Sequence, residues 1–182
     1  SQVGMCADLS EDRLKMVNRL FPSVFTTRDY REILKSEDID AVCIAAPTAL
    51  HFKITKEALE HRKHVLCEKP LALDPQECLE LKRIAREYKR HLMVGHVFIF
   101  NEGIRLLKQY IKSGQLGKIY YAHSERTNLG PFRYDVNALW DLAPHDISIF
   151  NYLFDAPPST ASARGQKYLN KNLEDVAFAN LE

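Results

Sequence analysis

The 182-residue sequence lacks the features that mark several special classes of protein. No apolar stretch approaches the roughly 18 residues of a membrane span, and the first residues show no signal-peptide pattern. Lysine and arginine number 25 against 24 acidic residues, with no basic run, so no nucleic-acid or membrane partner is indicated. Repeats and low-complexity segments are missing as well. Since 46% of the residues are apolar and 27% charged, we expect an ordinary globular protein.

The four cysteines and seven histidines also lack the spacings of metal sites. No C-x-x-C pair is present, and the histidines form neither H-x-x-x-H nor H-E-x-x-H, so we expect no metal. Three cysteines lie in apolar, strand-like runs, which predicts buried, reduced thiols in a cytoplasmic protein. An extracellular disulfide framework is the alternative.

Both ends of the sequence have the composition of sheet elements. There is no initiator methionine, and residues 3–7 already resemble a buried strand. Residues 176–181 predict another strand with no closing element after it. We therefore expect the sequence to be part of a longer chain.

The first half alternates apolar runs with amphipathic segments, which predicts a parallel, doubly wound α/β sheet. The six-residue run 41–46 is typical of a strand covered on both faces. Asp74 should cap one of the helices, with Pro75 at its first position. The expected strands are 3–7, 24–25, 41–46, 64–67 and 92–95, and the expected helices are 11–20, 29–36, 50–61 and 75–88.

The second half has more strands than helices, which predicts an α+β domain with a mostly antiparallel sheet. Residues 1–97 and 98–182 are the expected domains. A helix should begin at Asn101 and another near Pro144. The expected strands are 118–127, 159–169 and 174–182.

Polar or turn-forming residues follow the apolar runs of the first half. Ligands of doubly wound sheets bind outside the carboxyl ends of the strands. Any one of these turns could be an ordinary polar loop, but four together favour a binding cleft. They are Asp8, Pro47-Thr48, Glu68-Lys69-Pro70 and Gly95-His96.

The tripeptide Glu68-Lys69-Pro70 is the first candidate for chemistry. A lysine at the rim of a nucleotide cleft can hold a substrate oxygen and stabilise an alkoxide. Partial desolvation would bring its pKa toward the range of proton transfer. Pro70 restricts the backbone of the turn. Taken alone, the tripeptide fits a solvated surface lysine better.

The second candidate is Asp141-x-x-x-His145, with the two side chains four residues apart. If Pro144 begins a helix, His145 lies in its first turn, where the helix dipole keeps the ring neutral, as a general base requires. Asp141 could orient that ring or stabilise it once protonated. The alternative is an N-capping aspartate beside an ordinary surface histidine.

These motifs, with others in the same order and spacing, resemble the glucose–fructose oxidoreductase/inositol dehydrogenase (Gfo/Idh/MocA) family of NAD(P)-dependent sugar oxidoreductases. The similarity covers nearly the whole chain. Residues 128–137 are most similar to members that act on nucleotide-linked or amino sugars. The motifs are Ala46-Pro47-Thr48 with His51, KHVLCEKPLA at 63–72, GHVFIFN at 95–101, SGQLGK at 113–118 and Asp141-x-x-x-His145.

The resemblance implies a role for each matching position. Asp8 would hold the adenosine ribose hydroxyls, which favours NAD over NADP. The implied catalytic residues are Lys69, Asp141 and His145. The implied cofactor-binding residues are Asp8, Ala46, Pro47, Thr48, His51, Glu68, Lys69 and Pro70, and the implied substrate-binding residues are Lys69, Arg126, Asn128, Arg133 and His145.

The sequence departs from the family pattern in ways that bear on function. Residues 1–97 would be a partial Rossmann domain without the first strand and the G-x-G-x-x-G phosphate loop, and 98–182 the first part of a substrate domain. Ile99 stands where many members carry arginine, and Glu102 where many carry proline, so the substrate cleft should differ from the commonest type.

The expected activity is hydride transfer between NAD(P) and a ring hydroxyl or ketone of a sugar, including nucleotide-linked or amino sugars. The complete protein should form a homo-oligomer through the sheet of its second domain. A non-catalytic, NAD-responsive regulatory protein and an inactive fragment are the alternatives.

Overall fold

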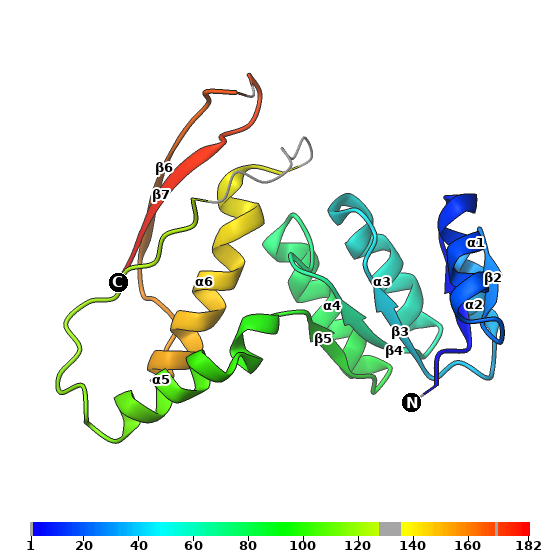
Figure 1. Ribbon diagram of the computed structural model, residues 1–182, viewed down its shortest axis with the longest axis horizontal. Helices are drawn as coiled ribbons and strands as arrows, with labels where there is room; N and C mark the ends of the chain where they lie inside the picture. Colours follow the sequence, from blue (N-terminus) through cyan, green and yellow to red (C-terminus); the bar gives the residue numbers. More distant parts are fainter. Residues whose placement is uncertain (1, 128–135, 170) are drawn as a thin grey trace. The chain divides into compact units, whose positions relative to one another are not determined.

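The computed structural model describes residues 2–127, 136–169 and 171–182 (Figure 1). The chain divides into two compact units, Ser1–Val94 and Gly95–Glu182. Within the described ranges, no helix has both the length and the apolar character to cross a membrane. Over the same residues, no group of three or more histidine, cysteine or acidic side chains is placed to hold a metal ion.

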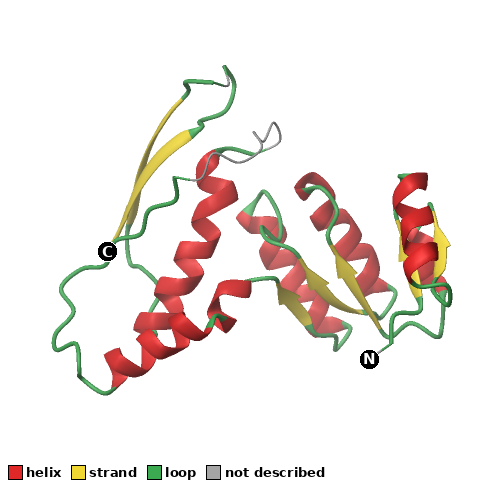
Figure 2. Cartoon of the chain, in the orientation of Figure 1, coloured by secondary structure: helices red, strands yellow, loops and turns green. Residues whose placement is uncertain are grey.

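The first unit contains the alternating strands and helices that the sequence predicts (Figure 2). All of its strand pairs are parallel, but they form two sheets: β1 pairs with β2, and β3, β4 and β5 form a second sheet in that order. The elements are β1 (Met5–Ala7), α1 (Glu11–Leu20), β2 (Phe25–Thr27), α2 (Tyr30–Lys35), β3 (Ala41–Ile44), the 3₁₀ turn η1 (Thr48–Leu50), α3 (His51–Glu60), β4 (His64–Cys67), α4 (Pro75–Glu87) and β5 (Leu92–Val94).

Side-chain caps fix the starts of three of these helices. Ser10 accepts a hydrogen bond from the backbone N–H of Arg13 at the start of α1. Asp29 begins α2 in the same way, and Asp74 begins α4 with Pro75 in its first turn. These caps satisfy N–H groups that have no partner within the helix. The predicted cap at Asp74 is confirmed.

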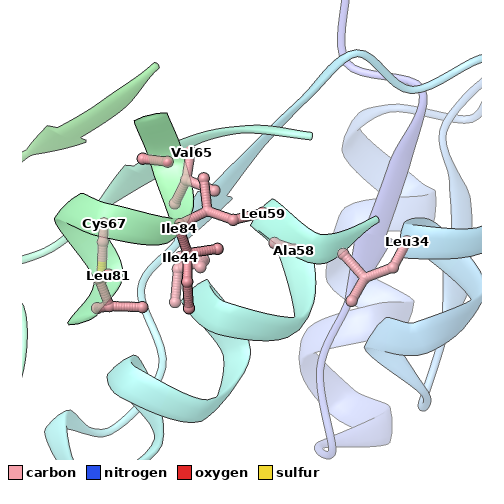
Figure 3. Packing of buried hydrophobic residues seen from close by; sticks show 9 residues of the cluster. Leu34, Ile44, Ala58, Leu59, Val65, Cys67, Leu81 and Ile84 are labelled. Carbon is pink, nitrogen blue, oxygen red and sulfur yellow. The ribbon is translucent and has the colours of Figure 1, made fainter. Parts of the chain in front are cut away.

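The core of the first unit lies between the second sheet and the helices α3 and α4 (Figure 3). Leu59 of α3 and Leu81 of α4 are fully buried, and so is Cys67 of β4. Burying side chains of this size gives about 1.5–3 kcal/mol each. The cluster consists of Leu34, Ile44, Ala58, Leu59, Val65, Cys67, Leu81, Ile84 and Ala85.

The opposite face of the second sheet is open, which corrects the expectation for residues 41–46. Cys43, Leu66 and Met93 occupy paired positions on adjacent strands, and all three are exposed. Side chains alternate between the two faces of a strand, and the described helices of this unit cover only one of them. An unbroken apolar run does not reveal how many faces are covered. The expectation of a buried thiol is therefore wrong for Cys43.

The second unit begins with a 3₁₀ turn and ends with an antiparallel strand pair. The predicted helix at Asn101 is confirmed, and the Asn101 side chain caps it by accepting from the N–H of Gly103. Residues 118–127 are not a strand, because no described segment forms a hydrogen-bonded ladder with them. The elements are η2 (Val97–Phe100), α5 (Glu102–Lys112), α6 (Ala138–Phe154), β6 (Ala161–Gln166) and β7 (Val176–Leu181).

Helix α6 starts six residues before the predicted position. Asn137 caps it, with its side-chain oxygen accepting from Trp140 N at 2.9 Å. Pro144 therefore lies inside the helix, where it supplies no N–H to the carbonyl of Trp140. His145 is the eighth helical residue, so the expectation that it lies in the first turn is wrong. The helix dipole cannot be the main influence on its ring, because that effect fades within one turn.

A buried lysine fastens α5 to the end of α6. Lys108 is 6% exposed, and its Nζ donates to the carbonyls of Tyr152 at 2.6 Å and Leu153 at 2.9 Å. It also forms an ion pair with Asp155 at 2.6 Å, and this contact lowers the pKa of the Asp155 carboxyl. A cation at the end of a helix satisfies carbonyls that the helix leaves unpaired.

Candidate active site

Asp8 follows β1 and is held by its own helix turn. Its Oδ1 accepts from Ser10 N at 2.8 Å, and its Oδ2 lies 3.2 Å from the guanidinium of Arg13. The Ser10 N–H, with Arg13 in a smaller role, lowers the pKa of this carboxyl. The carboxylate therefore stays ionised and keeps lone pairs for further hydrogen bonds. Such a carboxylate can accept hydrogen bonds from the two neighbouring hydroxyls of a ribose.

The loop after β3 contains Ala46, Pro47 and Thr48 and leads through η1 into α3. Thr48 is 4% exposed, whereas Pro47 is exposed. The backbone N–H of Glu68 donates to the carbonyl of Ile44 at 2.9 Å, which extends the β3–β4 ladder by one bond. This loop and the loop that carries Lys69 therefore start side by side at the carboxyl edge of the sheet.

The loop after β4 carries the predicted catalytic lysine. Glu68 is exposed, Lys69 is half-buried and Pro70 is buried; the Lys69–Pro70 peptide bond is cis. Lys69 N donates to the Glu68 carboxylate at 3.3 Å. The loop thus presents a partly accessible ammonium group at the edge where ligands of parallel sheets bind.

His51, the first residue of α3, lies inside the unit and is only 1% exposed. Its ring nitrogens are 2.7 Å from two backbone oxygens, Nδ1 from that of Pro70 and Nε2 from that of Ala46. The resemblance implied a cofactor contact for His51. In this structure its ring contacts the two loops, and little of its surface is accessible to a ligand.

In the second unit, His145 belongs to a cluster of aromatic and charged side chains. Its ring meets the Phe98 ring edge-on, with centroids 4.8 Å apart. The Arg126 guanidinium lies 4.8 Å from the centroid of the Phe98 ring, and Arg126 Nε donates to Asp146 Oδ2 at 2.7 Å. These contacts restrain Arg126 while its terminal nitrogens keep further N–H donors. Asp141 lies one helical turn before His145, a spacing that puts the two on one face of α6.

Phe98 and Asp146 received no role in the sequence analysis, and His96 was named only with Gly95 among the strand-end turns. Phe98 and Asp146 build the surroundings of Arg126 and His145, and Asp146 could have been suspected because it adjoins His145. His96 follows β5, where burial lowers its pKa and its Nδ1 is buried without a hydrogen-bond partner among the described residues.

The predicted substrate residues Asn128 and Arg133 lie outside the residues that the structure describes. Lys69 belongs to the first unit, and Asp141 and His145 belong to the second.

Two family profiles match the chain. The profile described as "Oxidoreductase family, NAD-binding Rossmann fold" covers residues 3–96, and that of the "GFO/IDH/MocA C-terminal domain" covers residues 104–182. The first alone spans more than half of the chain.

Curated relatives share a quarter to two fifths of their residues with the chain. An uncharacterized oxidoreductase, YrbE, of Bacillus subtilis is 28% identical over 180 residues, which cover 96% of this chain and 53% of the relative. UDP-N-acetylglucosamine 3-dehydrogenase of Acidithiobacillus ferrooxidans is 33% identical over 150 residues, covering 81% and 44%. A 2,7-anhydro-N-acetylneuraminate hydratase of Mediterraneibacter gnavus is 41% identical over 98 residues, covering 54% and 26%. The chain spans about half the length of the first of these relatives and less of the others.

Solved structures share the fold. A Klebsiella pneumoniae protein classed as an oxidoreductase superposes with a TM-score of 0.82 at 29% identity, covering 99% of this chain and 51% of the other. A levoglucosan dehydrogenase in complex with NADH and levoglucosan gives 0.83 at 24% identity, with 98% and 54% covered.

Proposed function

This chain belongs to the Gfo/Idh/MocA family of oxidoreductases with an NAD-binding Rossmann fold, and we propose that the complete protein is an NAD-dependent dehydrogenase acting on a ring hydroxyl of a sugar or polyol. The observation that carries the proposal is the position of Lys69, half-buried at the carboxyl edge of a parallel sheet. In the reverse direction, the same groups would reduce a ring ketone.

The side chains that follow β1, β3 and β4 fit the ribose and nicotinamide parts of the cofactor. Asp8 would accept hydrogen bonds from the adenosine ribose, and Pro47, Thr48 and Glu68 would border the nicotinamide end, with Ala46 and Pro70 shaping the loops. The Asp8 carboxylate disfavours a 2′-phosphate, which is why we propose NAD over NADP. When bound, the cofactor supplies the hydride acceptor.

Lys69 and His145 divide the proton and charge chemistry. The Lys69 ammonium donates a hydrogen bond to the reacting oxygen and stabilises the negative charge that develops there. His145 takes the hydroxyl proton, and Asp141 stabilises the ring once it is protonated. The edge-on Phe98 ring limits the rotation of the imidazole, so the base keeps one orientation. Asp141 thus replaces the helix dipole as the group that tunes this base.

Arg126 is the proposed specificity residue of the second unit. Its Nε is bound to Asp146, so the guanidinium has a fixed direction and offers its terminal N–H groups to polar or anionic parts of a substrate. Asn128 and Arg133 follow in sequence and are proposed to contribute further contacts. The relative named for UDP-N-acetylglucosamine and an inositol 2-dehydrogenase of Mycolicibacterium vanbaalenii, 35% identical over 130 residues, support a polyol, sugar or nucleotide sugar as the substrate class.

A second candidate is net hydration or dehydration of an anhydro sugar acid. It is favoured by the relative named as a hydratase, which is 41% identical over 98 residues. Such a reaction changes the mass of the sugar by one water and leaves the amount of oxidised cofactor unchanged at the end. The two candidates therefore differ in a measurable product.

The test uses the complete protein with NAD or NADP and a panel of inositols, sugars, nucleotide sugars and anhydro sugar acids. Absorbance of the reduced nicotinamide and the mass of the product are recorded together. A dehydrogenase forms NADH and a product two mass units lighter, whereas a hydratase adds or removes water without net NADH. Cofactor binding without turnover anywhere in the panel would favour a regulatory protein.

Oligomerisation and cellular location are also proposals. Every residue of β6 is exposed, and Phe178 of β7 is 76% exposed, so this strand pair has surface to bury. We propose a cytoplasmic homo-oligomer that associates through the sheet of the second unit. Sedimentation of the complete protein measures its oligomeric state.

A further inference from the structure

We propose that His51 is a positioning residue, which holds the loop of Lys69 against the loop of Pro47 and Thr48. The inference deepens the proposed function, on which its catalytic meaning rests. His51 would act without touching the cofactor or the substrate. Its ring spans two adjacent turns at the carboxyl edge of the second sheet and joins them through their backbones.

Two contacts carry the inference. Nδ1 lies 2.7 Å from the carbonyl oxygen of Pro70, the residue after Lys69, and Nε2 lies 2.7 Å from the carbonyl oxygen of Ala46, the residue before Pro47. Both distances are short for hydrogen bonds from nitrogen to oxygen. One ring therefore contacts a backbone oxygen beside each of the two candidate cofactor loops, donating to one of them when neutral and to both when protonated.

Burial gives these contacts their effect. His51 is 1% exposed, and Pro70 is buried as well, so water has little access to replace a lost bond. A carbonyl left without a donor in such a place is strongly unfavourable, and the loop would move to find one. The first turn of α3 holds the backbone of His51, so the ring projects from a rigid element rather than from a loop.

Histidine suits this role better than other side chains. Its planar ring places two nitrogens on separate edges, so one short side chain can reach two backbone oxygens. In either neutral tautomer one nitrogen donates, and in the protonated ring both do. Glutamine has a single N–H-bearing nitrogen, and leucine has none.

The functional consequence follows from the short path between His51 and Lys69. Pro70 is bonded directly to Lys69, so a shift of the Pro70 carbonyl also displaces the lysine. Displacing a catalytic group by about 1 Å can lower a rate by about a hundredfold. Cofactor affinity, which is spread over several other groups, should change much less.

The experiment compares His51→Leu and His51→Gln in the complete protein. We expect kcat to fall about 10- to 100-fold in His51→Leu, with partial recovery in His51→Gln, while KM for NAD stays within about threefold. Leu59→Ala is the matched control, because Leu59 is a fully buried residue of the same helix whose apolar side chain can form no hydrogen bond to either loop. It should lower the melting temperature and leave kcat within about twofold at temperatures where it is folded.

A second readout does not depend on turnover. Amide hydrogen exchange of residues 68–73 should become about tenfold faster in His51→Leu than in wild type, with no such local change in Leu59→Ala. Unchanged exchange of these amides would contradict the proposal that His51 holds the loop of Lys69, whatever the activity of the variant. Faster exchange with unchanged kcat would overturn the positioning role. If wild type shows no turnover at all, the proposed function fails, and exchange alone then decides whether His51 holds the loop.

Discussion

The two units of the chain are built by different means. The first has a continuous apolar core between a three-stranded parallel sheet and two helices. In the second, Val136 and Leu153 are the only buried apolar side chains among the described residues, and a buried lysine of α5 binds the end of α6. Apolar packing therefore stabilises most of the first unit, whereas polar contacts such as those of Lys108 contribute more to the stability of the second unit.

This difference explains what each unit contributes to the candidate site. In the first, the loop of Lys69 follows a strand of the packed second sheet, while Asp8 is held by Ser10 N and Arg13. In the second, His145 and Arg126 are restrained by side chains: the ring of Phe98 and the carboxylate of Asp146. Packing of the sheet supports the polar contacts of the first unit, whereas in the second unit hydrogen bonds and ring contacts restrain the site residues.

The largest expected effect tests whether both units serve one reaction. Lys69→Ala and His145→Ala should each lower kcat of the complete protein about 10²–10⁴-fold, with NAD affinity nearly unchanged, because each removes a positioned charge or base. Asp141→Asn should be milder, since it alters the tuning of the base. Steady-state kinetics at saturating substrate measures this.

Exposed residues of the same types provide the controls for these variants. Lys53→Ala in α3 and His123→Ala in residues 118–127 should keep wild-type kcat. If both Lys69→Ala and His145→Ala retained more than a tenth of kcat with chemistry rate-limiting, the proposed roles would be wrong.

The next effect tests the difference in packing. Leu81→Ala should lower the free energy of unfolding of the first unit by about 2–5 kcal/mol, because Leu81 is fully buried and its loss leaves a cavity. Leu107→Ala in α5 is the matched change in the second unit, and at 37% exposure it should cost less than about 1 kcal/mol. Urea unfolding of both variants measures the contrast, and equal losses would contradict it.

These packing differences also show why the sequence predicted one unit better than the other. The helices and strands of the first unit follow short apolar periods and local caps such as Ser10 and Asp74, which depend on neighbours in sequence. Residues 118–127 have strand composition, but a ladder needs a partner elsewhere in the chain. The start of α6 was misplaced because Pro144 suggested a first turn, whereas Asn137 provides the cap.

The sequence predicted which residues belong to the candidate site better than it predicted what each of them contacts. Its titratable groups stand at strand ends or at helical spacing, so Asp8, Lys69, Asp141 and His145 could be named from the sequence. The burial of His51 between two carbonyls could not, because it depends on a loop nineteen residues away. The contacts of Phe98 with His145 and of Asp146 with Arg126 could not be predicted for the same reason, because they join separate stretches of the chain.

A smaller effect concerns the polar fastening of the second unit. Lys108→Met should lower its free energy of unfolding by about 1–3 kcal/mol, because two helix-end carbonyls lose a charged donor. Lys112→Met is the control: this lysine is 66% exposed and 3.9 Å from the same Asp155 carboxylate, and its loss should have little effect. Thermal unfolding of the three proteins gives the comparison.

The same contact predicts a pH dependence. Since Lys108 lowers the pKa of Asp155 in the folded state below its ordinary 3.8, the ion pair stabilises the fold above that value. Its contribution is lost as the pH falls through the folded-state pKa. The stability difference between wild type and Lys108→Met should therefore shrink in acid. A difference that grew as the pH fell would contradict the assignment.

The smallest effect concerns the choice between NAD and NADP, which we attribute to Asp8 of the first unit. The complete protein should prefer NAD over NADP by about tenfold or more in kcat/KM, because Asp8 repels a 2′-phosphate. In Asp8→Ser the preference for NAD over NADP should become smaller, because Arg13 remains to attract the 2′-phosphate. Glu11→Ser, which removes a nearby surface carboxylate paired with Arg28, should leave it unchanged. A tenfold preference for NADP in wild type would exclude this role for Asp8.

The open face of the second sheet gives the chain a natural attachment point for a spectroscopic label. Cys43 is the exposed thiol on that face, whereas burial raises the pKa of Cys67 to about 11. Thiol reagents attack the thiolate, so at neutral pH a fluorescent maleimide should react with Cys43 well before Cys67. Attached beside Leu66 and Met93, the dye would report the solvent exposure of that face. Its emission could then follow the change in the surroundings of Cys43 during unfolding, without any substitution in the chain.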